Sequence, residues 1–200
     1  MYKRQAITDG KHDVMLFSDA GKAVRFDEND VRPMGRTARG VRGMNLAAQQ
    51  NVIAMLVAPA EASDGAAPAE DGVAAPSSVL TATENGFGKR TPIAEYTRHG
   101  RGTKGMIAIQ TSERNGKVVA ASLVSPEDQI MLITTGGVLV RTRVSEIREM
   151  GRATQGVTLI SVDEGTRLSG LQRIAESDSD DDADESVDEV DAAGESTPDA

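Results

Sequence analysis

The 200 residues include no cysteine and two histidines, which excludes disulfides and cysteine-based metal sites. The formal net charge of −9 is uneven: residues 1–175 hold all 22 Lys and Arg and 19 acids, whereas residues 176–200 hold 12 acids and no base. A mildly basic body is thus followed by a strongly acidic tail. No apolar run has the length of a membrane span, and the N-terminus lacks a secretion signal, so we expect a cytoplasmic protein.

Short apolar runs bounded by turn residues follow one another along the chain and predict β-strands. They group into three units: 14–18, 22–26, 40–46 and 52–57; then 79–83, 88–91, 105–111 and 118–124; then 130–134, 138–142, 156–162 and 168–174. No long amphipathic helix is evident. The pattern predicts an all-β, propeller-like array of four-stranded blades, with blade repeats at 1–58, 79–125 and 126–175.

The three units share a register. Residues 34–41 read MGRTARGV and residues 150–157 read MGRATQGV, with a weaker copy, GRGTKGM, at 100–106. Fourteen residues before the first glycine of each copy stands a turn glycine, and an arginine, an acid and an apolar residue follow that turn at fixed distances. The matched positions are Gly21/Gly86/Gly137, Arg25/Arg90/Arg141, Asp30/Glu95/Glu146, Val31/Tyr96/Ile147 and Gly35/Gly100/Gly151.

The glycines favour a structural interpretation. Gly21, Gly86 and Gly137 suit tight turns that need a positive φ. We expect Gly35, Gly100 and Gly151 to be structural turn glycines as well. Gly40, Gly105 and Gly156 would mark the bend where a strand leaves its blade.

The arginines allow two interpretations. Repeated cations on a rigid array lie along one rim, and regularly spaced cations suit the regularly spaced phosphates of duplex DNA. The alternative is that each arginine pairs with the acid of its own blade. For Arg25, Arg90 and Arg141 both interpretations stay open. For Arg36, Arg39, Arg101, Lys104 and Arg152 phosphate contact is favoured, and such contacts carry little sequence specificity.

Other segments predict no chemistry. Residues 59–78 are rich in Ala, Pro, Gly and Ser and predict a flexible insertion, and the tail 176–200 predicts disorder. His12 and His99 are too isolated for a metal site or a catalytic triad. Tyr96 shares its repeat position with apolar residues and is expected in the core. We therefore predict no catalytic residue and no metal site.

The stretches TENGFGKRTPIAEY, SERNGKVVAA and QIMLITTGGVLVRTRVSEI, with GRATQGVTLI, resemble the C-terminal domain family of bacterial DNA gyrase A. The resemblance runs from about residue 8 to the end, except for residues 59–78. It implies a six-bladed β-pinwheel whose neighbouring blades exchange strands, of which three are present here. Residues 1–5, MYKRQ, do not fit the family strand expected before ITDG.

The resemblance further implies a function. The family wraps double-stranded DNA around a basic rim and so supports negative supercoiling by a heterotetramer of gyrase A and gyrase B. The cleavage tyrosine, ATP and Mg²⁺ belong to other parts of that enzyme, so this chain would bind no cofactor and catalyse nothing alone. Two alternatives remain, the equivalent part of topoisomerase IV and a protein-interaction propeller that does not bind DNA. A nucleoid-associated location would accompany the DNA-binding function.

Overall fold

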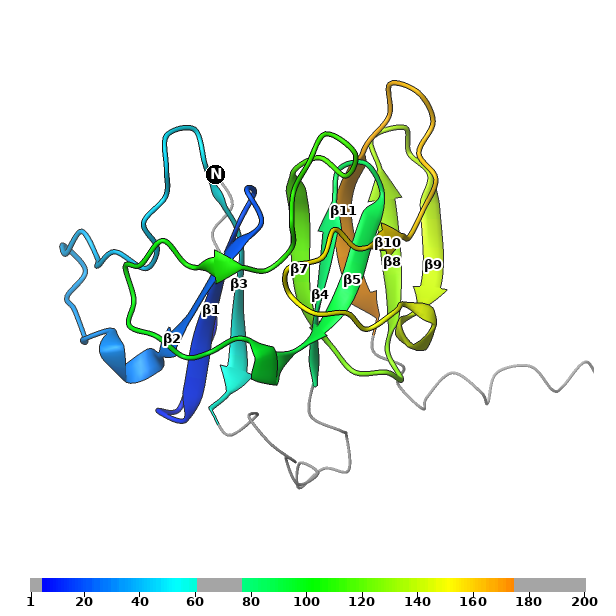
Figure 1. The fold of residues 1–200 in the computed structure, drawn as a ribbon. Coiled ribbons are helices and arrows are strands. Elements are labelled where there is room, and N and C mark those ends of the chain that lie inside the picture. The colour runs from blue at the N-terminus through cyan, green and yellow to red at the C-terminus, as the bar shows by residue number, and fades with distance from the viewer. Residues whose placement is uncertain (1–4, 61–76, 175–200) are drawn as a thin grey trace, which may run out of the picture.

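Three antiparallel sheets stand side by side in the computed structural model, which describes residues 5–60 and 77–174 (Figure 1). Within these residues no helix is both long and apolar enough to cross a membrane. The helical elements described are three short 3₁₀ helices, η1 (Glu28–Asp30), η2 (Ile93–Glu95) and η3 (Val144–Glu146). The acidic tail, residues 1–4 and residues 61–76 of the predicted insertion lie outside the described residues.

We call the sheets blades 1, 2 and 3. Blade 1 has the order β3 (Val52–Pro59), β1 (His12–Ser18), β2 (Lys22–Asp27), β6 (Met106–Ile107). Blade 2 has the order β10 (Val157–Thr158), β5 (Phe87–Pro92), β4 (Ser78–Thr83), β7 (Val118–Val124). Blade 3 has the order β11 (Leu168–Ile174), β8 (Gln129–Thr134), β9 (Leu139–Arg143). The all-β, blade-based fold is confirmed.

In each four-stranded blade, one of the two edge strands comes from the next repeat. β6 of the second repeat pairs with β2, and β10 of the third repeat pairs with β5. The expectation of one continuous strand at 105–111 and at 156–162 is wrong, because only two residues of each run pair in a ladder. The run at 40–46 forms no strand, and only Met44 makes an isolated bridge, to Thr103. An alternating pattern predicts an extended segment but does not identify its partner.

The hairpin turns require the glycines that the sequence places there. Gly21, Gly86 and Gly137 have φ of 74°, 80° and 82°, and each N–H donates to the carbonyl three residues earlier. This left-handed conformation is costly for any residue with a Cβ. The second set, Gly35, Gly100 and Gly151, directly precedes turns at 36–37, 101–102 and 152–153. These three glycines have no positive φ, so their own positions do not need glycine's conformational freedom; in the turn at 101–102 the positive φ, 76°, belongs to Gly102.

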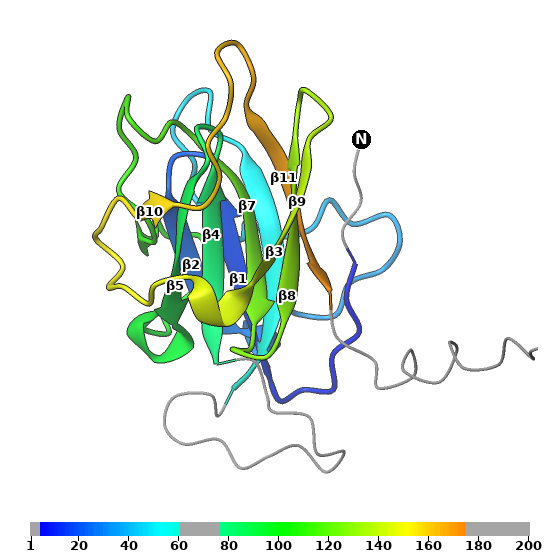
Figure 2. The same ribbon diagram turned by 90° about the vertical axis from the view of Figure 1, so that its right-hand side faces the viewer.

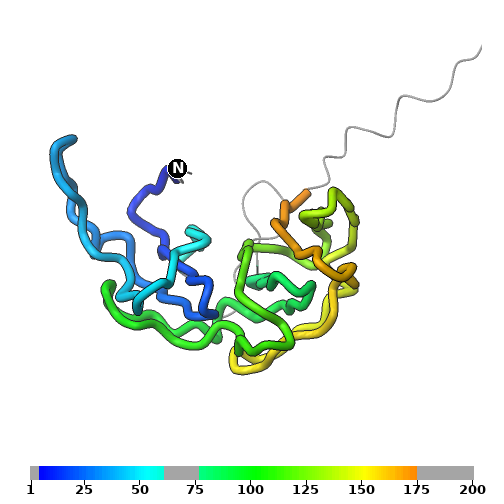
Figure 3. The backbone as a smooth tube through the Cα atoms, turned by 90° about the horizontal axis from the view of Figure 1, so that it is seen from above, coloured from blue at the N-terminus to red at the C-terminus, as the bar shows by residue number. Residues whose placement is uncertain are grey.

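The core lies between the blades. Met15 and Phe17 of blade 1 pack against Val79, Ile93 and Tyr96 of the second repeat, and a second cluster joins blades 2 and 3. Tyr96 is fully buried, as its repeat position predicts, and its ring meets Phe17 edge to face at 6.0 Å. Seen from above, the blades follow an arc (Figure 3), and the view along the arc shows the sheets stacked behind one another (Figure 2).

Candidate nucleic-acid interface

The segments that carry exchanged strands run along the convex outer side of the arc (Figure 3). Residues 96–111 leave the second repeat and follow β2, and residues 147–162 leave the third repeat and follow β5. In the first repeat the equivalent segment is 31–46. We call the first fifteen residues of each segment, 31–45, 96–110 and 147–161, the rim segments.

Basic charge is concentrated in the rim segments. Together they hold nine Lys and Arg and one acid, Glu149. The other residues up to 175 hold 13 bases and 18 acids, so the remainder of the body is net acidic. Residues 31–45 carry four arginines and no acid. An anionic partner is therefore attracted to the convex side of the molecule.

Arg25 is buried and cannot contact a phosphate. For this residue the phosphate-contact interpretation is therefore wrong. Its side chain is 4% exposed and lies 2.7 Å from Asp13, which is itself fully buried. It also donates to the carbonyls of Ile93 and Tyr96 in the next repeat, at 3.1 Å each. The alternative named the wrong acid as well, because Arg25 pairs with Asp13 and not with Asp30.

Arg90 has the equivalent role at the next joint. Its Nε donates to the carbonyl of Ile147 at 2.8 Å, one repeat further along the chain. Arg141, at the third repeat position, is exposed and donates to the side chain of Gln129. The three arginines that share this repeat position therefore differ in role. Arg25 and Arg90 join neighbouring blades, whereas Arg141 is exposed on blade 3.

Arg101 and Arg152 hold neighbouring rim segments together. Arg101 donates through Nε to the carbonyl of Asp30 at 3.0 Å and through Nη1 to that of Arg42 at 3.2 Å. Arg152 donates to the carbonyl of Ile107 at 3.3 Å. Both side chains are half-buried, so their positive charge stays at the rim surface while part of each guanidinium is already bonded.

The three remaining predicted cations are exposed: Arg36, Arg39 and Lys104. Sequence reasoning missed four further exposed arginines of the rim segments: Arg32, Arg42, Arg98 and Arg148. Arg32 and Arg148 stand eleven residues after Gly21 and Gly137, so the repeat register itself could have identified them. Threonine occupies that position in the middle repeat.

Lys89 is buried beneath the third rim segment. Its Nζ donates to the carbonyls of Gly151 and Arg152, at 2.5 Å and 2.6 Å. Burial lowers the pKa of Lys89 from 10.5 to about 8, because the low-dielectric surroundings disfavour the charged amine. Burial likewise raises the pKa of Tyr96 well above its ordinary value.

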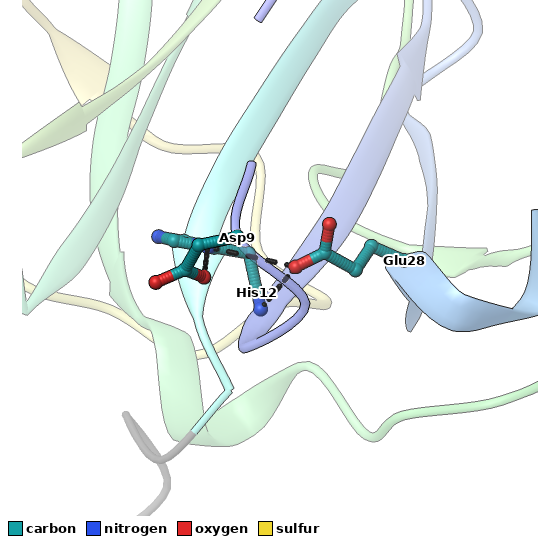
Figure 4. Close-up of side chains that lie close together, drawn as sticks. All are labelled: Asp9, His12 and Glu28. Atoms are coloured by element: carbon teal, nitrogen blue, oxygen red, sulfur yellow. Dashed lines mark hydrogen bonds and ion pairs between the residues drawn. The ribbon is translucent and has the colours of Figure 1, made fainter. Parts of the chain in front are cut away.

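His12 is not isolated, contrary to the sequence prediction. Its Nδ1 lies 2.9 Å from Asp9, and its backbone N–H donates to Glu28 at 2.7 Å (Figure 4). The pKa of Asp9 is lowered chiefly by the Lys11 N–H and the pKa of Glu28 chiefly by the Thr8 hydroxyl. These contacts fasten residues 8–11 to blade 1, and Glu28 lines a cleft together with Val31 and Met34 of the first rim segment.

Comparison with known proteins relates these blades to one family. The family model described as DNA gyrase C-terminal domain, beta-propeller, matches residues 12–59, 77–125 and 128–175. The DNA gyrase A protein of Pseudomonas aeruginosa is 50% identical over 179 residues, 90% of this chain and 18% of that protein. The corresponding protein of Haemophilus influenzae is 48% identical over 196 residues, 92% of this chain and 22% of that protein. The chain thus spans about a fifth of the length of these relatives.

Solved structures agree with the fold. A DNA gyrase A C-terminal domain superposes with a TM-score of 0.69 at 25% identity, covering 82% of this chain and 51% of that one. A DNA topoisomerase IV C-terminal domain gives a TM-score of 0.70 at 22% identity, covering 84% and 48%.

Proposed function

This chain belongs to the DNA gyrase C-terminal domain family, and on that premise we propose that it binds duplex DNA along its convex rim and bends the DNA around the blades. The observation that carries the proposal is the charge of the rim segments, nine bases against one acid on an otherwise acidic body. Duplex DNA presents one phosphate charge per about 1.7 Å of its axis, which a row of cations on a convex surface can follow.

The exposed cations Arg36, Arg39 and Lys104 would make the primary phosphate contacts. Arg101 and Arg152 would add charge while fixing the spacing between rim segments. Arg25 and Arg90 set the angle between blades and so the path of the DNA. Because these contacts reach the backbone and not base edges, binding should depend little on sequence.

In the whole enzyme this module would wrap DNA for ATP-dependent negative supercoiling by gyrase A and gyrase B together. We propose that cleavage, ATP and Mg²⁺ belong to parts of the enzyme outside this chain. A cytoplasmic, nucleoid-associated location goes with this role. Gyrase is favoured over topoisomerase IV because relatives at 48–50% identity are gyrase A proteins. The solved domains of the two enzymes match at 25% and 22% identity and support the shared fold.

Salt dependence of DNA affinity tests the proposal. We would measure binding of the full chain to a fluorescent 40-base-pair duplex between 50 and 300 mM salt. The logarithm of affinity should fall with the logarithm of salt with a slope of about −0.9 per contacted phosphate, steeper than about −3 in total. A protein-interaction propeller would show no such slope and no binding at low salt.

A charge-matched pair of variants locates the contacts. The triple variant R36Q/R39Q/K104Q should lower affinity about tenfold or more and make the slope shallower by about 0.9 per lost contact. The control R114Q/K117Q/R167Q removes the same charge from the loops before β7 and β11. Equal losses in the two variants would contradict a rim-specific site.

A further inference from the structure

The joints between neighbouring blades share their backbone bonds. Between blades 1 and 2, the N–H of His99 donates to the carbonyl of Arg25 at 2.8 Å, and between blades 2 and 3, the N–H of Met150 donates to the carbonyl of Arg90 at 2.9 Å. We call these contacts the first and the second joint. Because a rim segment lies on the preceding blade in the same way at both, their side chains can be compared position by position.

Polar side chains lie beneath the rim at the second joint. Lys89 and Thr91 belong to β5, and both are fully buried. The Nζ of Lys89 donates to the carbonyls of Gly151 and Arg152. The Oγ1 of Thr91 donates to the carbonyl of Met150 at 2.9 Å. Three consecutive carbonyls of the third rim segment are thus held from below.

The first joint has apolar side chains at these two positions. By the repeat register, Val24 stands for Lys89 and Phe26 for Thr91, and they are 1% and 3% exposed. Neither has a polar side-chain atom that could donate to the second rim segment. Val24 instead lines a pocket of about 290 Å³, together with Thr103. A joint therefore forms without a lysine, and packing of the blades does not account for burying a charge at Lys89.

The surroundings of Lys89 leave its charge sensitive to a further anion. Burial lowers its pKa to about 8, with Glu95 of η2 favouring the charged amine and Arg152 opposing it. The Glu95 carboxylate also accepts the N–H of Arg152, at 3.0 Å. Opposite Lys89 on β4 stands the uncharged Thr81. Glu149, the acid of this rim segment, accepts a hydrogen bond from a β4 hydroxyl at 3.3 Å.

On the premise of the DNA-binding function proposed above, we propose that Lys89 is a positioning residue of the DNA interface: it fixes the turn at 151–152 from beneath and adds its charge to the third rim segment. A phosphate above this turn and an ammonium below it stabilise each other. Because such coupling is reciprocal, bound DNA favours the protonated Lys89 as much as the protonated Lys89 favours DNA. Affinity contributed by this residue should therefore be lost as the pH rises above about 8.

DNA affinity as a function of pH tests the proposal. The full natural chain and K89M would be titrated against the fluorescent duplex at about 100 mM salt, from pH 7 to pH 9.5. K89M should bind about three- to tenfold more weakly at pH 7, and the difference should shrink towards pH 9.5 as the natural chain loses the proton. Equal affinities at pH 7 would overturn the proposal.

The pH dependence separates this role from a merely structural one. A neutral lysine amine still donates hydrogen bonds, so a structural role would leave the difference between the natural chain and K89M unchanged up to pH 9.5. That outcome would overturn the charge contribution. Thermal melting at each pH checks that K89M is folded. K89R keeps its charge at every pH used, so the ratio of its affinity to that of K89M should stay constant.

The variant R36Q distinguishes failure of this inference from failure of the proposed function. Arg36 is exposed on the first rim segment, and its charge is not lost in this pH range. R36Q should weaken binding by the same factor at every pH. If R36Q weakens binding and K89M does not, DNA binding stands and the role of Lys89 is wrong. If neither variant alters affinity and salt has no effect, both proposals fail.

Proton uptake measures the coupling directly. Calorimetric titration of DNA at pH 8.5, in two buffers with different ionisation enthalpies, gives the number of protons bound with the duplex. With a tenfold coupling, the natural chain should take up about half a proton more than K89M. Equal uptake by the two chains would show that DNA does not affect Lys89 and would overturn the proposal.

Discussion

At the scale of single residues, the first joint contains a buried charge, the carboxylate of Asp13. Asp13 receives Arg25 from its own blade and, at 2.7 Å, Arg98 from the next repeat. A buried carboxylate is tolerated only while its partners remain, because the interior cannot solvate it. Removing either arginine would therefore leave part of the Asp13 charge uncompensated inside the first joint.

We expect Arg25→Met to lower the free energy of unfolding by about 3–5 kcal/mol, because it leaves Asp13 buried and without its nearest partner on blade 1. Arg141→Met, at the exposed equivalent position, should cost less than about 1 kcal/mol. Urea denaturation followed by circular dichroism measures both. Equal costs would show that Arg25 does not hold the joint.

The buried Lys89 should make the free energy of unfolding rise with pH, whereas most lysine ion pairs make it fall. Its folded pKa of about 8 lies below the unfolded value near 10.4, so between these pH values the unfolded chain binds more protons. Stability contributed at this site should therefore rise with pH over that window, by about 2 kcal/mol from pH 8 to 10, and be unchanged below it.

The stability difference between the natural chain and Lys89→Met isolates this contribution, since other titrating groups cancel. Denaturation at pH 7, 8, 9 and 10 measures the free energy of unfolding of both chains. As the pH rises, this free energy should increase for the natural chain relative to Lys89→Met. A difference that is flat, or that moves the other way, would mean that Lys89 keeps its proton when buried.

At the scale of elements, the sequence predicts the strands and turns well and their partners poorly. Hairpins such as β1–β2 are local, so a period-two pattern and a turn glycine are enough to predict them. β6 and β10 pair with a hairpin more than sixty residues away, which no local pattern encodes.

The role of Arg25 was missed for the same reason. The carbonyls to which it donates lie in the next repeat, far away in the sequence. Val31 and Tyr96 share a repeat position but differ in burial, because blade 1 covers Tyr96 and no neighbouring blade among the described residues covers Val31.

The exchange itself can be tested at the bend glycines. Gly156→Ala places a Cβ against the backbone of Gly88 at φ 83°, and Gly40→Ala meets only the strain of the same φ. The second change should cost about 1–2 kcal/mol, and the first should cost clearly more because β10 must shift. Thermal melts of the two variants compare them, and equal costs would mean that β10 contributes little to blade 2.

At the scale of the whole molecule, charge is arranged in three zones: the basic rim, an acidic remainder of the body, and the tail with 12 acids. The tail lies outside the described residues, and its effect follows from charge and attachment alone. If the rim binds DNA as proposed, a tethered polyanion at high effective concentration would compete with DNA for the rim.

Ending the chain after residue 175 should therefore tighten DNA binding at low salt, and the effect should fade as salt screens both partners. Titration of the shortened and full chains against the same duplex checks this. Unchanged affinity at 50 mM salt would show that the tail does not reach the rim.

The most direct test of the central claim, that the convex rim bends DNA along its own path, is ligation of a nicked circle in the presence of the full chain. The circle is sealed, the protein is removed, and the linking number is read on a gel. The account predicts a shift of one consistent sign that grows with bound protein and disappears with R36Q/R39Q/K104Q. An unchanged linking number at full occupancy would contradict it.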